Sequence, residues 1–117
     1  MISTLLMLVL INASRLQFNE QPLQVYSQLE QRAELRAKYI YNSKQWSHLG
    51  WKESFIGLDC SYIGENLARE YTNTEILHKA FLKSPSHAAN ILKARYNVIG
   101  IGTYEDITVE LFCDKNK

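Results

Sequence analysis

Residues 63–71 read IGENLAREY, and at positions 64–66 a glycine, a carboxylate and an amide stand side by side. An apolar, partly β-like stretch over residues 55–63 leads into this group, and helix-favouring residues follow it. The pattern predicts a strand, a break at Glu65, and a short helical piece to about Tyr71. A charge at such a break needs either a structural partner or a functional role.

Two helices are predicted upstream of this break. The first begins at a Ser3 or Thr4 cap and runs to about Arg15. The second begins near Pro22, which suits a first helical turn, and ends at about Asn42. Residues at helical spacing in the second helix are predicted to face inward: Tyr26, Leu29, Ala33, Ala37 and Ile40. Charged residues between them are predicted to face solvent: Glu30, Arg32, Glu34 and Arg36.

Two shorter helices are predicted downstream. The polar loop at residues 72–75 caps a third helix over 75–83. The sequence Ser-Pro-Ser at 84–86 ends that helix, and its last serine caps a fourth helix over 87–94. His87 is therefore expected on the first turn of a helix.

The C-terminal part alternates in the manner of a sheet. Val98, Ile99 and Ile101 stand around two glycines, a turn is predicted at 105–106, and residues 107–113 carry apolar side chains at every second position. Helices come first and strands appear in the middle and at the end, which predicts an α+β layered domain with an antiparallel sheet. The 117 residues are expected to form a single domain, residues 1–117.

Composition excludes several functional classes. Thirteen Lys and Arg residues balance twelve Asp and Glu residues, and the basic residues are scattered, so nucleic acid is not an expected partner. The apolar run from Leu5 to Ile11 is too short to span a bilayer. It also lacks the basic flank of a secretory signal, so we interpret it as part of a domain helix.

Cys60 and Cys113 are the only cysteines. They are enough for one disulfide in an oxidising compartment, and they equally fit two small buried thiols. The sequence leaves both alternatives open.

Three candidates for chemistry fall at predicted breaks between elements: His48, Glu65 and His87. Two imidazoles and a carboxylate can hold a zinc-like ion and leave one position for water. Without a metal, the same groups could form a histidine–carboxylate pair for acid–base work. Taken singly, each histidine is more often a surface or capping residue.

Other polar and aromatic residues have weaker functional interpretations. Ser84 and Ser86 lie beside His87, but serine next to proline usually belongs to a turn. His78 is predicted to be a solvated histidine on a helix surface. The aromatic residues Trp46, Trp51 and Tyr62 could line a groove or complete a core.

Four stretches in order resemble one family: LINASR (10–15), WSHLGW (46–51), IGENLA (63–68), and FLKSPSHAANIL with YNVIGIG (81–92 and 96–102). They are similar to the CAP superfamily of cysteine-rich secretory proteins, antigen 5 and pathogenesis-related 1 proteins, and especially to its bacterial sperm-coating-protein-like branch. The resemblance implies a three-layer α-β-α sandwich with a small antiparallel sheet between helices.

The resemblance also implies roles for individual residues. Glu65 would point into a central cleft opposite His48 and His87. The amide of Asn66 would tie backbone near the cleft, and Asn12 and Arg15 would serve in packing and loop anchoring.

One residue of the family pattern is missing. Family members with a complete cavity carry a second acid shortly after the aromatic position matched by Phe81. Here residues 82–84 are Leu-Lys-Ser, so the cavity is incomplete.

The first functional hypothesis is therefore a non-enzymatic binding or interaction module. Its His48–Glu65–His87 cleft is a candidate site for a divalent metal such as Zn²⁺, and its partner would be a protein, a lipid or a cell-envelope ligand. The alternative is a metal-assisted hydrolase of peptide or cell-envelope material, with Glu65 as base or ligand. A third hypothesis is a structural or host-contact subunit of a larger assembly such as a phage particle. The family favours an extracellular or virion-associated location, although the sequence shows no clear signal peptide.

Overall fold

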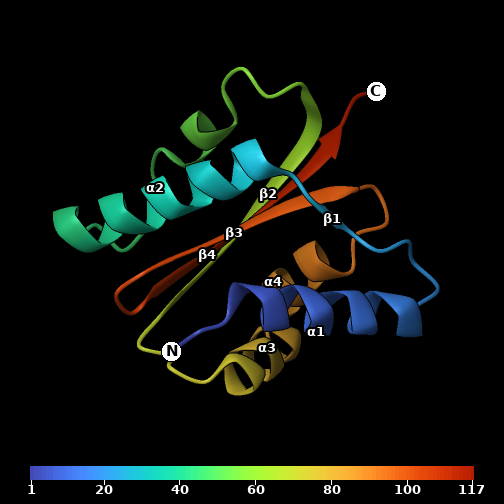
Figure 1. Ribbon diagram of the computed structural model, residues 1–117, viewed down its shortest axis with the longest axis horizontal. Helices are drawn as coiled ribbons and strands as arrows, with labels where there is room; N and C mark the ends of the chain where they lie inside the picture. Colours follow the sequence, from blue (N-terminus) through green and yellow to red (C-terminus); the bar gives the residue numbers. More distant parts are fainter.

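The computed structural model describes all residues, 1–117, as three layers with a four-stranded sheet in the middle (Figure 1). The elements in chain order are α1 (Thr4–Gln17), β1 (Gln24–Val25), α2 (Ser27–Ser43), the short 3₁₀ helix η1 (Trp51–Phe55), β2 (Cys60–Arg69), α3 (Thr74–Lys83), α4 (Pro85–Ile91), β3 (Val98–Tyr104) and β4 (Ile107–Lys115). Helix α2 covers one face of the sheet, and α1, α3 and α4 cover the other. The predicted α-β-α sandwich is confirmed.

The sheet has the strand order β1-β3-β4-β2. Strands β3 and β4 form the predicted hairpin around a turn in which Glu105 has a φ of 53°. Strand β2 pairs antiparallel with β4, as expected for the sheet, but it runs over Cys60–Arg69 and not over the predicted stretch 55–63. The short strand β1 was not predicted, and it pairs parallel with β3. Strand β2 is therefore the long outer strand of the sheet.

Helix α2 begins at Ser27 instead of Pro22. The residues between them cannot join the helix because Gln24 and Val25 extend along β3. The prediction that Arg36 faces solvent is also wrong, because Arg36 is 7% exposed. It lies three residues after Ala33 and four before Ile40, which places it beside the inward stripe of the helix.

The predicted helical piece after Glu65 is wrong, because β2 continues without interruption to Arg69. The Glu-Asn-Leu-Ala-Arg segment favours a helix locally, but nine residues of β2 pair with β4, and this pairing decides the conformation. Helix α4 starts at Pro85, its first helical residue, so Ser84 instead of Ser86 is the N-cap residue. His87 lies in the first turn of α4, as predicted.

Two hydrophobic clusters hold the layers together. On one side of the sheet, Met7, Ile11 and Phe81 from the helices pack on strand residues such as Phe112. On the other side, residues of α2 pack on Val109, Leu111 and their neighbours. Gly100 and Gly102 let α2 approach β3 closely, because a Cβ atom on either glycine would collide with the α2 backbone.

Arg15 anchors three distant segments from a fully buried position in α1. Its guanidinium donates to four backbone carbonyls, those of Gln21, Ile91, Lys93 and Tyr96. Asn12 exchanges two hydrogen bonds with the backbone of Leu23, at 2.8 and 3.0 Å. The expected packing and anchoring roles of both residues are confirmed.

Cys60 and Cys113 form a disulfide that joins β2 to β4. The sequence left this pairing open, and the structure decides it in favour of the bridge.

The outer face of α1 carries exposed apolar side chains and no charge. These side chains are Leu5, Leu6, Val9 and Leu16, with Phe18 at the end of the helix. None of the helices combines the length and the apolar composition that crossing a membrane requires.

Candidate functional site

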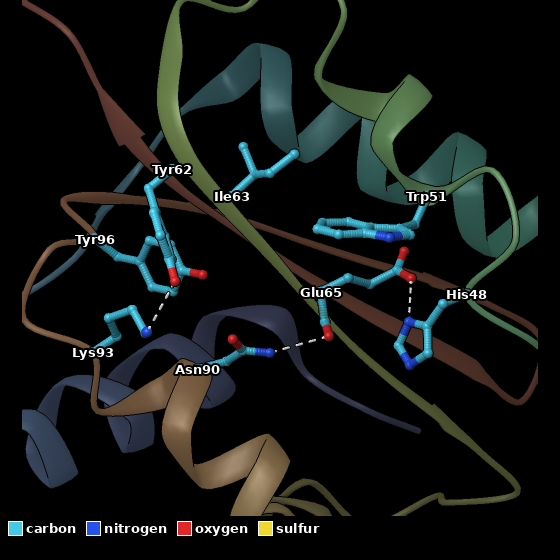
Figure 2. A pocket seen from close by; sticks show the side chains of 8 residues that line it. All are labelled: His48, Trp51, Tyr62, Ile63, Glu65, Asn90, Lys93 and Tyr96. Atoms are coloured by element: carbon cyan, nitrogen blue, oxygen red, sulfur yellow. Dashed lines mark hydrogen bonds and ion pairs between the residues drawn. The ribbon is translucent and has the colours of Figure 1, made fainter.

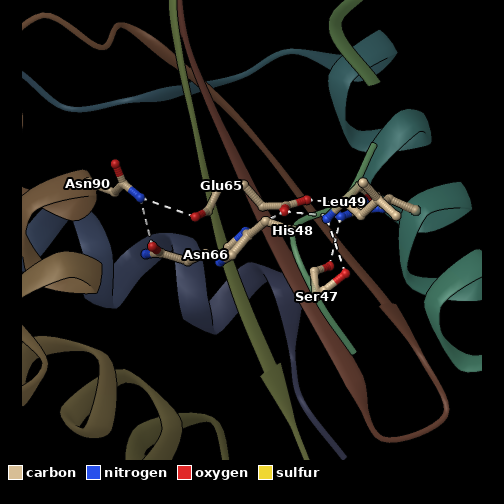
Figure 3. Close-up of polar contacts among 7 residues, drawn as sticks. Ser47, His48, Leu49, Glu65, Asn66 and Asn90 are labelled. Atoms are coloured by element: carbon tan, nitrogen blue, oxygen red, sulfur yellow. Dashed lines mark hydrogen bonds and ion pairs between the residues drawn. The ribbon is translucent and has the colours of Figure 1, made fainter. Parts of the chain in front are cut away.

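Glu65 lies in the middle of β2 and turns its side chain toward α2, where two residues bind it. Arg36 donates from Nε to Oε2 at 2.8 Å and from Nη2 to Oε1 at 3.3 Å. The Nδ1 atom of His48 lies 2.8 Å from Oε1 (Figure 3). The Glu65 side chain is 1% exposed, whereas the His48 side chain is 56% exposed. Glu65 thus joins a buried arginine to a histidine at the surface.

Arg36 also positions the loop that carries His48. Its Nη1 and Nη2 atoms donate to the carbonyls of Leu49 and Ser47, at 3.1 and 3.2 Å. One guanidinium therefore fixes both the carboxylate and the backbone on either side of the histidine. Sequence reasoning missed this residue, although its spacing from Ala33 and Ile40 was a usable signal.

Asn66 leaves β2 on the side opposite Glu65, toward α4 (Figure 3). Its Nδ2 donates to the carbonyl of His87 at 3.2 Å and to Oε1 of Glu110 at 3.1 Å. Its Oδ1 accepts from Asn90, which also donates to the Glu65 carbonyl. Asn66 therefore ties β2 to β4 and α4, which is the structural role that the resemblance implied.

Glu110 is a second buried acid that sequence reasoning did not single out. It is fully buried in β4, and its Oε2 has no hydrogen-bond partner. Burial raises the pKa of Glu110 to about 8, and the hydrogen bond from Asn66 opposes this shift. Glu110 is therefore mostly protonated and uncharged at neutral pH.

His87 does not join Glu65 and His48 in one cluster. Its Nδ1 lies 2.8 Å from the Ser84 hydroxyl oxygen, and its ring packs on Phe81 with 4.9 Å between ring centres. Burial lowers the pKa of His87, and the charge of His48 lowers it further. His87 therefore favours the neutral form.

The contacts of His48, Glu65 and His87 do not match the predicted three-ligand metal site. Both Glu65 oxygens are already bound by Arg36 and His48, and a cationic guanidinium lies where a metal would compete for them. No group of three His, Cys, Asp or Glu side chains is arranged to hold a metal ion.

A cleft of about 300 Å³ opens beside Glu65 (Figure 2). Its lining residues are His48, Trp51, Tyr62, Ile63, Glu65, Asn90, Lys93 and Tyr96. They come from both sides of β2: Trp51 and His48 lie on the side of α2, and Asn90 and Lys93 on the side of α4. Of the aromatic residues considered from sequence, Trp51 and Tyr62 line this cleft.

A second hollow of about 280 Å³ lies farther along β2 and is mostly apolar. His87, Ser84, Phe81 and Trp46 contribute to its lining. The two predicted histidines therefore open into different hollows of the same strand. The Ser84 hydroxyl contacts His87, and no acidic side chain completes a catalytic triad with these two residues.

His78 differs from its prediction as a solvated residue. It is 5% exposed, and its Nε2 lies 2.9 Å from the Ser14 hydroxyl oxygen between α3 and α1. Burial lowers the pKa of His78. It is a core histidine and lines neither hollow.

A comparison with family models matches residues 8–110 to CAP, the cysteine-rich secretory protein family. The chain belongs to the CAP family. The search of curated proteins gives no match. Because the family match covers most of the chain, it includes the residues that line both hollows, and also Glu65 with its partners Arg36 and His48.

Solved structures share the CAP fold at low sequence identity. An extracellular protein with an SCP domain from Bacillus anthracis aligns over 93% of this chain and 39% of its own, with a TM-score of 0.84 and 21% identity. A cysteine-rich secretory protein from Staphylococcus aureus aligns over 95% and 38%, with a TM-score of 0.88 and 16% identity. The chain thus spans less than two fifths of these two proteins.

A third similar structure is closer in size. An outer surface protein from Borrelia burgdorferi aligns over 95% of this chain and 91% of its own, with a TM-score of 0.85 and 21% identity. At such identities the comparison establishes the fold and leaves the ligand to be argued from this chain's own residues.

Proposed function

We propose that this CAP domain is a non-catalytic binding module that uses the cleft beside Glu65. The observation that carries the proposal is that both oxygens of the buried Glu65 carboxylate are hydrogen-bonded. Both oxygens accept hydrogen bonds from Arg36 or His48, and 1% of the side chain is exposed. A general base needs an oxygen directed at its substrate, and Glu65 offers none.

The lining of the cleft supports binding. Trp51, Tyr62 and Tyr96 supply aromatic surface, while Lys93 and Asn90 supply polar groups at the same opening. Aromatic walls combined with a few placed polar groups are typical of ligand sites. Burial raises the pKa of Tyr96 to about 12, so its phenol is a neutral hydrogen-bond donor at physiological pH.

The hydrolase hypothesis has less support from the same residues. It required His48, Glu65 and His87 to converge, and His87 opens instead into the second hollow. No step through a metal is therefore proposed.

We further propose that the domain works outside the cytoplasm. The Cys60–Cys113 disulfide is stable in oxidising compartments. Two similar structures are described as an extracellular protein and an outer surface protein.

The test is nuclear magnetic resonance of the ¹⁵N-labelled protein with three defined probes: a heptapeptide library, a soluble muropeptide, and a single-chain lipid below its micelle concentration. We expect one class to give saturable shifts at residues 48–51, 62–65 and 90–96 and to be recovered intact by mass spectrometry. Catalytic cleavage of a probe, shifts confined to other surfaces, or no saturable binding by any class would contradict the proposal.

A matched pair of variants locates the binding surface. Tyr62 lines the cleft and is 38% exposed, whereas Tyr41 on α2 lies outside it and is 43% exposed. Tyr62→Ala is expected to weaken probe binding about tenfold by removing aromatic surface, and Tyr41→Ala to leave it unchanged.

A second candidate function, a subunit of a larger assembly, is favoured by the uncharged outer face of α1. Exposed apolar surfaces of this kind commonly mark protein interfaces. If α1 packs against another copy, sedimentation should show association that Val9→Lys abolishes. A monomer at all concentrations would contradict self-assembly.

A further inference from the structure

Strand β2 has an unpaired outer edge. It is the last strand in the sheet order, and it pairs only with β4. An edge strand carries a row of peptide N–H and C=O groups that can pair with another extended chain. Which residues supply those groups follows from the hydrogen bonds around the edge.

The even-numbered residues of β2 face β4. The Glu70 N–H, which follows the strand, donates to the Asp106 carbonyl at 3.0 Å. Peptide groups of antiparallel strands alternate in direction, so Ala68, Asn66 and Gly64 also turn toward β4.

The odd-numbered residues therefore face outward, and two contacts agree. The Cys113 carbonyl accepts from Asn97 on the far side of β4, so its partner Ile63 is left without that bond. From outside the strand, Asn90 donates to the Glu65 carbonyl at 3.2 Å. The peptide groups of Ile63 and Leu67 have no such partner at the edge.

Both hollows lie along this edge. The cleft adjoins Ile63 and Glu65, and the second hollow adjoins residues 67–69. Helix α4 and Lys93, two residues after its end, form one wall. The loop with Trp46 and His48 forms the other. The unpaired peptide groups thus lie on a strand edge that is flanked by two walls; Figure 2 shows the part of this edge beside the cleft.

We propose that the outer edge of β2, between these two walls, binds an extended polypeptide segment that pairs with it. The inference rests on the proposed binding function and names its ligand class. The segment pairs with Ile63 and the N–H of Glu65, and an apolar side chain enters the second hollow. Added strands gain affinity from main-chain hydrogen bonds and selectivity from pockets for alternate side chains.

Charge narrows the ligand further. Arg95 lies 4.6 Å from the Tyr62 ring centre but is paired with Asp114 at 3.3 Å. Lys93, 4.8 Å from the same ring centre, has no such acidic partner, so an acidic residue is favoured at this end.

The first experiment measures amide hydrogen exchange with the probe already named, a blocked heptapeptide library of alternating valine and serine or aspartate. Added-strand pairing should slow exchange at Ile63 and Glu65 and leave Gly64 and Asn66 unchanged. Equal protection of both sets, or protection of the even set alone, would overturn the proposal.

The second experiment uses a proline at an outward position. Proline is tolerated on a sheet edge where its missing N–H would face away from the ladder. Ile63→Pro should therefore weaken peptide binding about tenfold or more, while Ile63→Val should retain it within about threefold. Equal affinity in both variants would contradict the pairing.

Two additional tests keep the result interpretable if a variant does not fold. If Ile63→Pro does not fold, the wild-type protein is tested with peptides methylated at single backbone nitrogens, and undiminished binding of every methylated peptide overturns the pairing. Lys93→Glu should reverse the preference for acidic peptides. If the muropeptide or lipid shifts the cleft resonances and peptides do not, this inference fails and the binding function stands; if no probe binds there, both fail.

Discussion

Two glutamates are buried in neighbouring strands, and the surroundings of their carboxylates differ. Glu65 in β2 faces α2, where Arg36 neutralises it and His48 links it to the surface. Glu110 in β4 faces the other helical layer, where its only side-chain partner is the uncharged amide of Asn66. The first acid has a cationic partner at 2.8 Å, and the second avoids the cost of burying a charge by holding a proton.

The two acids therefore differ in whether a ligand in the cleft can affect them. Glu65 is coupled to a half-exposed histidine at the rim of the cleft, so a bound ligand can touch its network. Glu110 has no route to solvent, and its protonation is coupled to folding. The variants below test this contrast, beginning with the largest expected effect.

Arg36→Met should leave the buried Glu65 with His48 as its only side-chain partner. The methionine preserves much of the side-chain packing, but removing one partner of a buried ion pair costs about 3 to 5 kcal/mol of the free energy of unfolding. Urea denaturation at neutral pH measures the loss. Arg32→Met is the matched control, since Arg32 lies one turn earlier and donates only to carbonyls; an equal loss in both variants would show that the carboxylate is not the cause.

Glu110→Gln should flatten the pH dependence of stability. Below pH 4.5 both folded and unfolded states hold the proton. Between 4.5 and about 8 the unfolded state loses it while the folded state keeps it, so wild-type stability falls by about 1.4 kcal/mol per pH unit, and the fall levels off above 8.

The measurement for Glu110→Gln is chemical denaturation of both proteins from pH 4 to pH 9. Relative to its value at pH 4, the variant should gain roughly 3 kcal/mol over wild type by pH 7. Parallel curves across this range would contradict a protonated Glu110.

Asn66→Ala should destabilise the fold by about 1 to 3 kcal/mol, because it leaves buried partners on β4 and α4 without hydrogen bonds. It also removes the contact that lowers the pKa of Glu110, so the fall of stability should extend to higher pH. Thermal melts across pH test both effects. An unchanged melting temperature would contradict this role.

His48→Ala should have the smallest effect on stability, less than about 1 kcal/mol, because the ring is half-exposed and Arg36 still neutralises Glu65. Its main effect should fall on probe binding in the cleft. Denaturation and binding measured on one sample separate the two, and a large loss of stability would make His48 a structural residue.

Much of the layered fold could be predicted because its local signals are strong. The alternation of residues 98–113 indicated a hairpin, and the inward stripe of α2 indicated an amphipathic helix. The prediction for the segment after Glu65 was wrong because its composition favours a helix locally, while its pairing with β4 favours a strand. That pairing joins residues more than forty positions apart, such as Asn66 and Glu110, and the local sequence does not show it.

The candidate site was predicted only in part. His48 and Glu65 meet as expected, but Arg36 was assigned to solvent, since charges on a helix usually are and its partner is 29 residues away. Glu110 could have been found, because strand alternation places it opposite Val109 and Leu111, and a sandwich buries both faces of its sheet. His87 instead contacts Ser84 and Phe81 and lines the second hollow, contacts that spacing along the chain does not encode.

The four contacts of Arg15 have a consequence for sequence variation. They end on backbone carbonyls, which nearly every amino acid supplies in the same form. Positions 21, 91, 93 and 96 can therefore change their side chains without losing the anchor, provided that the loops keep their course. A fold stabilised by contacts to backbone carbonyls tolerates side-chain substitution at the acceptor positions, which agrees with a fold shared at 16% and 21% identity.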